Sequence, residues 1–124
     1  MSLDQIACLQ RNSMYVGSHG FDHYWLDSFP EETQKREIDL SLEFLGKVGS
    51  DPNRWIICYP YGAYDESLLS ILKDRNCLAG LSTEVGIADL EHDNLLTLPR
   101  LDTNDLPKDS KVEPNEWTRK AISG

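Results

Sequence analysis

Apolar residues along this chain gather in short runs separated by longer amphipathic segments. Four of these runs predict strands, near residues 14–18, 55–60, 78–83 and 95–101. The second run, RWIICYP, is continuously apolar, which is typical of a parallel strand covered on both faces. Between the runs, residues 28–49 and 65–76 repeat apolar side chains every three or four positions, which predicts two helices.

The ends of the predicted helices carry start and stop signals. Ser28 and Glu31 have the spacing of a capping box at the start of the first helix, and Asp65 is the expected N-cap of the second. Strands that alternate with helices in this way predict βαβ units and a parallel sheet. A complete eight-fold barrel of such units takes roughly 250 residues. These 124 residues therefore form either a small open α/β sheet or a partial barrel.

The length fits one domain with a modest core. We expect residues 1–12 to be a lead-in, whose Met-Ser-Leu start resembles a vector-derived sequence. Residues 13–107 should form the α/β domain, and residues 108–124 a polar C-terminal tail. Within the tail, the segment NEWTRKAIS predicts a short helix.

Charge and composition disfavour several classes of partner. Lysine and arginine total 12 against 21 acidic residues, and the net charge of −9 argues against nucleic acid and anionic membrane surfaces. No apolar run approaches the roughly 20 residues that span a bilayer, and the N-terminus has no secretory signal, which leaves the compartment open. Cys8, Cys58 and Cys77 are scattered, so we expect reduced thiols rather than a disulfide framework or a cysteine-rich zinc site.

Two histidines four positions apart follow the first predicted strand, in GSHGFDHYWL (17–26). In a helical turn, His19 and His23 would share one side, and both imidazoles could reach one divalent ion. The alternative is two unrelated polar residues in a loop. After the second predicted strand, YPYGAYD (59–65) forms a stiff aromatic turn at the same carboxyl edge of the sheet, and tyrosine rings suit stacking on a sugar. For Tyr59 the alternative is a core position.

Four segments in order carry a family resemblance: GSHGFDH, PEETQKREIDLSLEFLG, ICYPYGAYDESLLSILKDRNCLAGLSTEVG and LLTLPRLDTND. From about Met14 to Pro107 they resemble the polysaccharide deacetylase family, also called NodB homology or carbohydrate esterase family 4. The resemblance implies a partial, distorted (β/α) barrel and metal-dependent removal of N-acetyl groups from a sugar or polysaccharide. It implies that His19 and His23 bind a divalent metal, for which zinc is the first candidate. Pro60, Tyr61 and Gly62 would bind the substrate.

The chain departs from the family pattern at several positions. It has no adjacent pair of aspartates, which the family uses as catalytic base and third metal ligand. Cys58 stands where many members carry an arginine, and His92 has the context of a surface residue rather than of the family's late catalytic histidine. Arg100 resembles a late family arginine that orients a carboxylate in the catalytic site, and the alternative for it is a surface salt bridge.

These observations lead to two functional interpretations. The parent protein is either a hydrolase of non-peptide C–N bonds that deacetylates sugars, or a non-catalytic module that binds a glycan or a protein partner. For these 124 residues alone we expect zinc to bind weakly or not at all and deacetylase activity to be absent, because the aspartate pair is missing. We also expect a homo-oligomer, because a partial barrel exposes a sheet edge and apolar surface.

Overall fold

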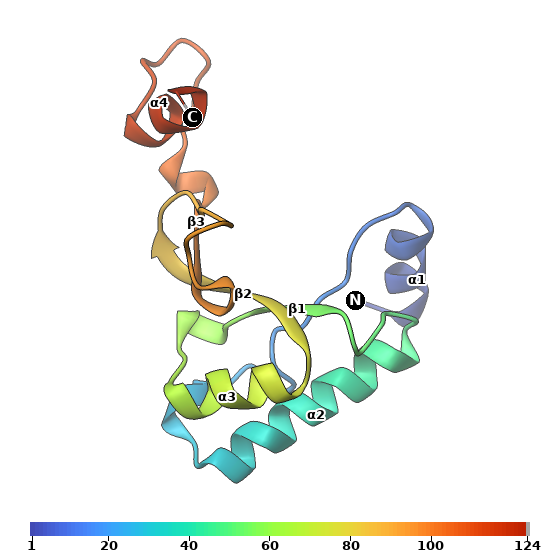
Figure 1. Cartoon of the computed structure of the whole chain (residues 1–124). Helices are drawn as coiled ribbons and strands as arrows, with labels where there is room; N and C mark the ends of the chain where they lie inside the picture. The colour runs from blue at the N-terminus through green and yellow to red at the C-terminus, as the bar shows by residue number, and fades with distance from the viewer. Residues whose placement is uncertain (124) are drawn as a thin grey trace.

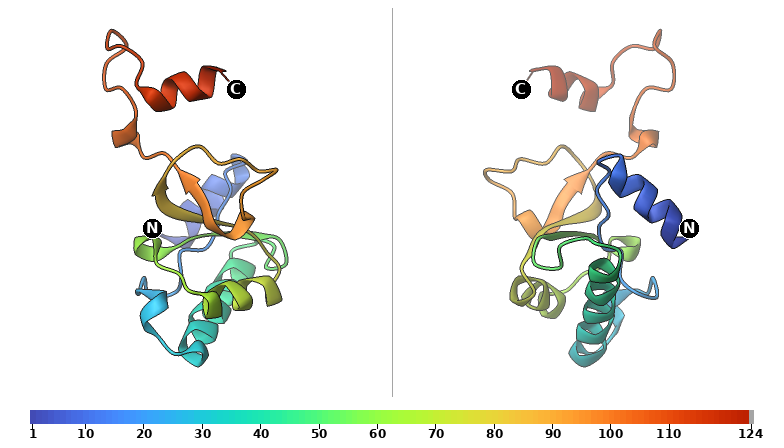
Figure 2. Two further views of the ribbon diagram at one scale, coloured as in Figure 1. Left: turned by 60° about the vertical axis from the view of Figure 1, so that its left-hand side comes forward. Right: turned by 90° about the vertical axis from the view of Figure 1, so that its right-hand side faces the viewer.

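Three short parallel strands form an open sheet in the computed structural model, which describes residues 1–123 (Figure 1). In sheet order they are β1 (Trp55–Cys58), β2 (Cys77–Val85) and β3 (Leu98–Arg100). Parallel neighbours need a crossover, and α3 (Glu66–Asp74) connects β1 to β2. It lies beside α2 (Glu31–Lys47), on the same side of the sheet (Figure 2). This arrangement confirms the predicted α/β fold of a partial barrel, with its sheet open.

Two further helices lie toward the ends of the described chain. The first, α1 (Leu3–Arg11), falls within the predicted lead-in, and Ser2 and Gln5 form a reciprocal capping box at its start. The second, α4 (Glu116–Ser123), confirms the short helix predicted in the tail. Figure 1 shows α4 standing apart from the sheet at the end of a long connection.

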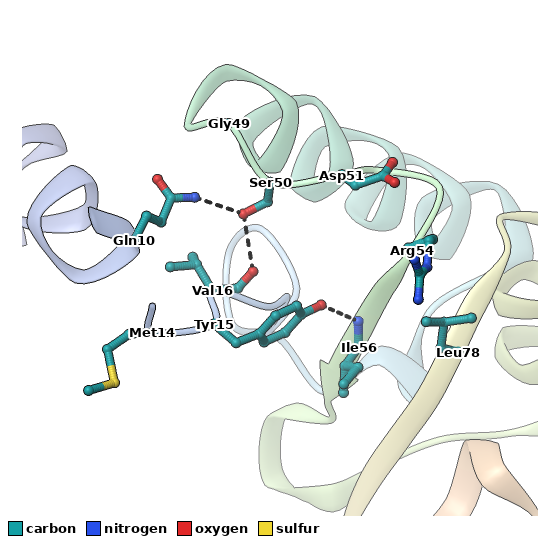
Figure 3. Close-up of a pocket in the computed structure, with 10 residues that line it drawn as sticks. All are labelled: Gln10, Met14, Tyr15, Val16, Gly49, Ser50, Asp51, Arg54, Ile56 and Leu78. Carbon is teal, nitrogen blue, oxygen red and sulfur yellow. Dashed lines mark hydrogen bonds between the residues drawn. The ribbon is translucent and has the colours of Figure 1, made fainter. Parts of the chain in front are cut away.

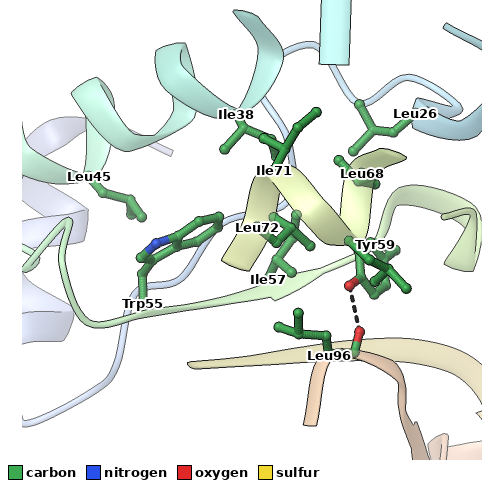
Figure 4. Close-up of a cluster of buried hydrophobic side chains, with 11 residues drawn as sticks. Leu26, Ile38, Leu45, Trp55, Ile57, Tyr59, Leu68, Ile71, Leu72 and Leu96 are labelled. Atoms are coloured by element: carbon green, nitrogen blue, oxygen red, sulfur yellow. Dashed lines mark hydrogen bonds between the residues drawn. The ribbon is translucent and has the colours of Figure 1, made fainter. Parts of the chain in front are cut away.

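The hydrophobic core lies between β1, α2 and α3 (Figure 4). Its buried members are Leu26, Ile38, Leu45, Trp55, Ile57, Tyr59, Leu68, Leu69, Ile71, Leu72 and Leu96. The indole Nε1 of Trp55 donates to the carbonyl of Arg75 at 2.8 Å, and the hydroxyl of Tyr59 donates to the carbonyl of Leu96 at 2.5 Å. Both aromatic residues thus bury their rings with a satisfied polar atom, so Tyr59 is a core residue.

β1 is buried on one face only. Trp55 and Ile57 are fully buried toward the helices, whereas Ile56 and Cys58 on the other face are half-buried. The prediction that this strand is covered on both faces is therefore wrong. An open sheet has helices against one face, and the described residues place no second layer over the other.

The strand predicted at 14–18 is reduced to one bridge, between Ser18 and Ile57. Upstream of the bridge, the hydroxyl of Tyr15 accepts a hydrogen bond from the backbone N–H of Ile56 at 2.9 Å. A side chain thus takes the place that the backbone of a neighbouring strand would occupy. The edge of β1 is satisfied without a full ladder, which is why the apolar run does not form a strand.

Helix α2 is shorter than the predicted segment 28–49. It begins at Glu31 because Pro30 has an extended backbone (φ −58°, ψ 151°). The predicted capping box at Ser28 is wrong, since the Ser28 hydroxyl donates instead to the carbonyl of Trp25 at 2.6 Å.

Helix α3 also starts one residue inside the predicted segment 65–76, and its predicted N-cap is confirmed. Asp65 accepts a hydrogen bond from the N–H of Leu68 at 2.8 Å. The strand predicted near 95–101 is β3 alone, preceded by a 3-10 turn at Leu95–Thr97. Asn94 caps that turn through the N–H of Leu96, so the first half of the apolar run folds as a turn.

Candidate functional site

The histidine segment leaves the sheet at the carboxyl end of β1. The N–H of Ser18 donates to the carbonyl of Ile56 at 2.9 Å, and the N–H of Cys58 donates to the carbonyl of Ser18 at 3.0 Å. The hydroxyl of Ser18 is buried and lies 2.6 Å from the hydroxyl of Ser41 on α2. Backbone and side chain together fix the point from which His19 projects.

His19 and His23 come together through a reversed loop and not through a helical turn. Residues 19–25 are non-helical, so the helical-turn argument made from the spacing is wrong. Positive φ angles at Gly20 (73°) and His23 (59°) turn the chain back on itself. The two imidazole centroids lie 4.7 Å apart with an interplanar angle of 62°, so the structure does bring the pair together.

The tautomer of His19 follows from its hydrogen bond. Its Nδ1 lies 2.6 Å from the backbone carbonyl oxygen of Cys58, and because a carbonyl only accepts, Nδ1 carries the proton. The lone pair of Nε2 is then available. Metal-binding histidines show this pattern, with one ring nitrogen donating to a carbonyl and the other facing the ion. The imidazole of His19 is oriented by the backbone carbonyl of Cys58, and this orientation does not need the Cys58 thiol.

A buried glutamate holds the loop between the histidines. The side chain of Glu37 on α2 is 4 % exposed, and its Oε2 accepts a hydrogen bond from the N–H of Asp22 at 2.9 Å. Within residues 1–123, no three histidine, cysteine, aspartate or glutamate side chains gather as a metal-binding group. The two imidazoles thus fit a divalent ion as two of its ligands, and the described part of the chain adds no third.

The turn formed by Pro60, Tyr61 and Gly62 lies against the histidines. Tyr61 and Gly62 both have positive φ angles, 58° and 73°. A Cβ at Gly62 would lie 2.1 Å from the Oγ1 of Thr83, so only glycine fits beside β2. The ring of Tyr61 contacts the ring of His23, with centroids 4.9 Å apart. The structure thus brings together the predicted metal ligands and the predicted substrate turn.

Trp25 belongs to the same cluster and was not among the predicted site residues. Its ring stacks on the ring of Tyr61 at 4.4 Å with an interplanar angle of 4°. The sequence offers a signal for it, because Phe21, Tyr24 and Trp25 crowd three aromatic residues around the second histidine. All three are exposed, whereas aromatic side chains in a core would be covered.

Arg100 and His92 are not part of this ring cluster. Arg100 is on β3, two strands from β1, where its Nε donates to the carbonyl of Ser82 at 2.8 Å. It lines a small cavity of about 130 Å³ together with Asp102 and Asp105, and it forms no ion pair with another described residue. His92 is 78 % exposed and pairs with Asp89 at 2.8 Å, in agreement with the surface context seen in the sequence.

A larger cavity, of about 520 Å³, opens at the other end of the sheet (Figure 3). It lies at the amino end of β1, between α1 and residues 14–16, and Gln10 and Ser50 form a hydrogen bond across its rim at 3.2 Å. In parallel sheets chemistry collects at the carboxyl ends of strands, so the histidine loop and not this cavity is the candidate site.

Comparisons with known proteins bear on the family and the fold. A family model described as polysaccharide deacetylase matches residues 2–79. No curated protein sequence matches significantly. No helix among residues 1–123 is long and apolar enough to cross a membrane.

Several solved structures share the fold. A Streptococcus pyogenes deacetylase in complex with acetate aligns with a TM-score of 0.74 at 24 % identity, over 99 % of this chain and 50 % of its own. The deacetylase domain of BpsB from Bordetella bronchiseptica gives 0.70 at 14 % identity, over 81 % and 48 %. A family 4 carbohydrate esterase from Streptomyces lividans in complex with acetate gives 0.58 at 17 % identity, over 70 % and 42 %. The chain spans about half the length of these structures.

Proposed function

Because this chain belongs to the polysaccharide deacetylase family, we propose that its full-length protein removes N-acetyl groups from a sugar polymer with the help of a divalent metal. The observation that carries the proposal is the pair His19 and His23 at the carboxyl end of β1, with the rings 4.7 Å apart. A likeness to solved structures supports the fold, and the histidine geometry supports the chemistry.

His19 and His23 would supply two of the metal's ligands, and zinc suits two imidazoles. The Cys58 carbonyl holds a proton of His19 on Nδ1, so in the neutral imidazole Nε2 is the nitrogen that can bind a metal. Glu37 fixes the loop through Asp22, so the imidazoles need little reorganisation. A divalent ion held there would supply Lewis-acid activation of an amide carbonyl and of water.

The turn at Tyr61 would handle the substrate. Its backbone N–H donates to no acceptor among the described residues, while the N–H of Gly62 is engaged by the carbonyl of Tyr59 at 2.9 Å. A free N–H beside the histidines suits the oxyanion that develops when the acetyl carbonyl is attacked. Pro60 is buried and Gly62 is required by Thr83, so the turn presents this donor in a fixed place.

The third ligand and the catalytic base would come from outside these 124 residues. The sequence has no adjacent aspartates, and the chain spans about half the length of the solved structures that it resembles. We propose Arg100 as a weaker candidate that orients such a carboxylate, because it forms no ion pair within the described chain. The 124 residues alone would bind zinc weakly and release no acetate.

A non-catalytic module is the second candidate. The exposed aromatic rings beside the histidines favour it. In this interpretation the same surface binds an N-acetylated glycan without hydrolysing it.

Acetate release by the full-length gene product, with an N-acetylated chito-oligosaccharide as substrate, separates the two functions. We expect zinc- or cobalt-dependent release that His19→Ala lowers at least 100-fold, because the loss of a ligand weakens the metal site. His92→Ala is the matched control and should keep full activity, since His92 is exposed and remote. A full-length product that retains metal and is inert would establish the binding module instead.

A further inference from the structure

Trp25 and Tyr61 stack face to face next to the histidine pair. We propose that this pair is a sugar-stacking subsite, which holds one N-acetylated pyranose ring of the polymer beside the reacting residue. The inference rests on the proposed function for the identity of the ligand. It assigns Trp25 a role that the resemblance to the family does not supply.

The geometry of the two rings favours a ligand. They are parallel within 4° at 4.4 Å, yet Trp25 remains 53 % exposed and Tyr61 51 % exposed. Exposing two large aromatic side chains to water is unfavourable unless something covers them. The carbon–hydrogen face of a pyranose can pack on the outer face of this stack, and the hydroxyl of Tyr61 and the indole N–H of Trp25 can bond to its hydroxyl groups.

The backbone of Trp25 and Leu26 is held before any ligand arrives. Leu26 is completely buried, and its carbonyl accepts a hydrogen bond from Nε2 of the buried Gln34 at 3.0 Å. The carbonyl of Trp25 accepts from both the N–H and the hydroxyl of Ser28, at 3.1 and 2.6 Å. A residue whose backbone is fixed in this way loses little conformational entropy when a sugar binds.

Backbone strain at the site is a second, independent observation. In the described part of the chain four residues other than glycine have positive φ angles: Ser13, His23, Tyr61 and Asn76. Ser13 and Asn76 directly follow the C-caps of α1 and α3, where a left-handed residue is usual. His23 and Tyr61 do not follow the end of an α-helix and lie in turns beside the candidate site. Left-handed residues that the fold does not require cluster at binding and catalytic sites, and these two rings contact each other.

The ring contacts also lead from the stacking pair to the candidate metal ligands. Trp25 contacts Tyr61, Tyr61 contacts His23 at 4.9 Å, and His23 contacts His19 at 4.7 Å. A sugar ring packed on this stack therefore lies beside the histidines. The net charge of −9 favours a neutral, fully N-acetylated glycan over a polyanion.

The test uses the 124-residue chain and an N-acetylated chito-tetraose, without added metal. The indole N–H signals of the chain's three tryptophans serve as probes: Trp55 is buried and bonded to Arg75, and Trp117 lies under Lys120 on α4. We expect the signal of Trp25 alone to shift on titration. Trp25→Ala and Tyr61→Ala should each weaken binding about ten-fold, Trp25→Phe should restore part of it, and Trp117→Ala should bind as the unchanged chain.

The proposal is overturned if Trp25→Ala binds the oligosaccharide as well as the unchanged chain, if the shift appears at Trp117 instead, or if the unchanged chain shows no binding. Backbone amide spectra of each variant establish that the fold is retained. The outcome is separable from that of the proposed function. If binding depends on Trp25 but the protein releases no acetate, the subsite is supported and the proposed function is not. If acetate is released and Trp25→Ala does not change its rate, the proposed function is supported and the subsite is not.

Discussion

The imidazole Nδ1 of His19 lies 2.6 Å from the backbone carbonyl oxygen of Cys58. The side chain of His19, in the loop that follows Ser18, is thereby fixed by Cys58, the last residue of β1. The contact determines the tautomer of His19 and does not depend on the side chain at position 58. The orientation of the histidine is therefore independent of the side chain at position 58.

Glu37 anchors the histidine loop, and its removal should loosen the loop locally. We expect Glu37→Ala to speed amide hydrogen exchange at Asp22 and to lower the free energy of unfolding by about 1–3 kcal/mol, because a part-buried hydrogen bond to the carboxyl group is lost. Glu43→Ala on the same helix is the control, since its ion pair with Lys47 is exposed, and should change stability by no more than about 0.5 kcal/mol. Equal effects of the two substitutions would show that Glu37 is not an anchor.

Gly62 is the residue that permits the Tyr61 turn. Gly62→Ala should lower the free energy of unfolding by more than about 1 kcal/mol, because its φ of 73° disfavours a side chain and because the new Cβ would lie 2.1 Å from Thr83 Oγ1. Gly46→Ala in α2 meets nothing within 4 Å and should stabilise the chain by roughly 0.5–1 kcal/mol. Urea denaturation of both variants checks the prediction, and a neutral Gly62→Ala would contradict the turn described here.

Burial raises the pKa of the Cys77 thiol to about 11. The unfolded thiol ionises near its ordinary value of about 8.5, so the unfolded state loses protons first and the folded state becomes less stable as pH rises between these two values. Urea midpoints at pH 7, 9 and 10.5 should fall with pH, and Cys77→Ala should flatten part of the decline. An unchanged slope in that variant would contradict the assignment to Cys77.

The same burial predicts selective thiol chemistry. Cys8 is exposed, so an alkylating reagent at pH 8 should modify Cys8 well before Cys77, as mass mapping of the labelled peptides would show. Faster labelling of Cys77 than of Cys8 would mean that β2 opens readily in solution.

Self-association stays a prediction. The edge of β1 is better satisfied than the sequence suggests, because Tyr15 and Ser18 engage its backbone at Ile56 and Cys58. Apolar surface remains at the nearby cavity, where Met14 and Leu78 are exposed. We expect sedimentation at high concentration to show dimers that Leu78→Glu weakens. A chain that stays monomeric throughout would contradict this expectation.

Sequence reasoning predicted the parts of the fold that local patterns control. The helical periodicity located α2 and α3, and the N-cap at Asp65 is an interaction between residues three apart. The strand predicted at 14–18 failed because Tyr15 folds its hydroxyl onto Ile56, a contact between residues 41 apart in sequence. The spacing of His19 and His23 correctly predicted that the two imidazoles lie close together. It wrongly attributed this to a helical turn, because the left-handed backbone of His23 cannot be read from a sequence.

The candidate site divides in the same way. The motifs placed His19, His23 and Tyr61 together because strand ends meet at one edge of a parallel sheet. Trp25 was not predicted as a site residue because its position depends on the stack with Tyr61, which is a tertiary contact between two turns. The buried Glu37 and Gln34 were not predicted either, since their polar character in an amphipathic helix looks like that of any solvent-exposed residue.

The most direct test of the central claim is a zinc titration of this chain in the His92→Ala background, which leaves His19 and His23 as the histidines. Their ring proton signals should shift together, only at a large excess of zinc, and His19→Ala should abolish the shift of His23. Histidine signals that ignore zinc, or a His23 shift that survives His19→Ala, would contradict a shared metal site. Tight one-to-one binding would contradict the two-ligand site and reveal a third ligand within these 124 residues.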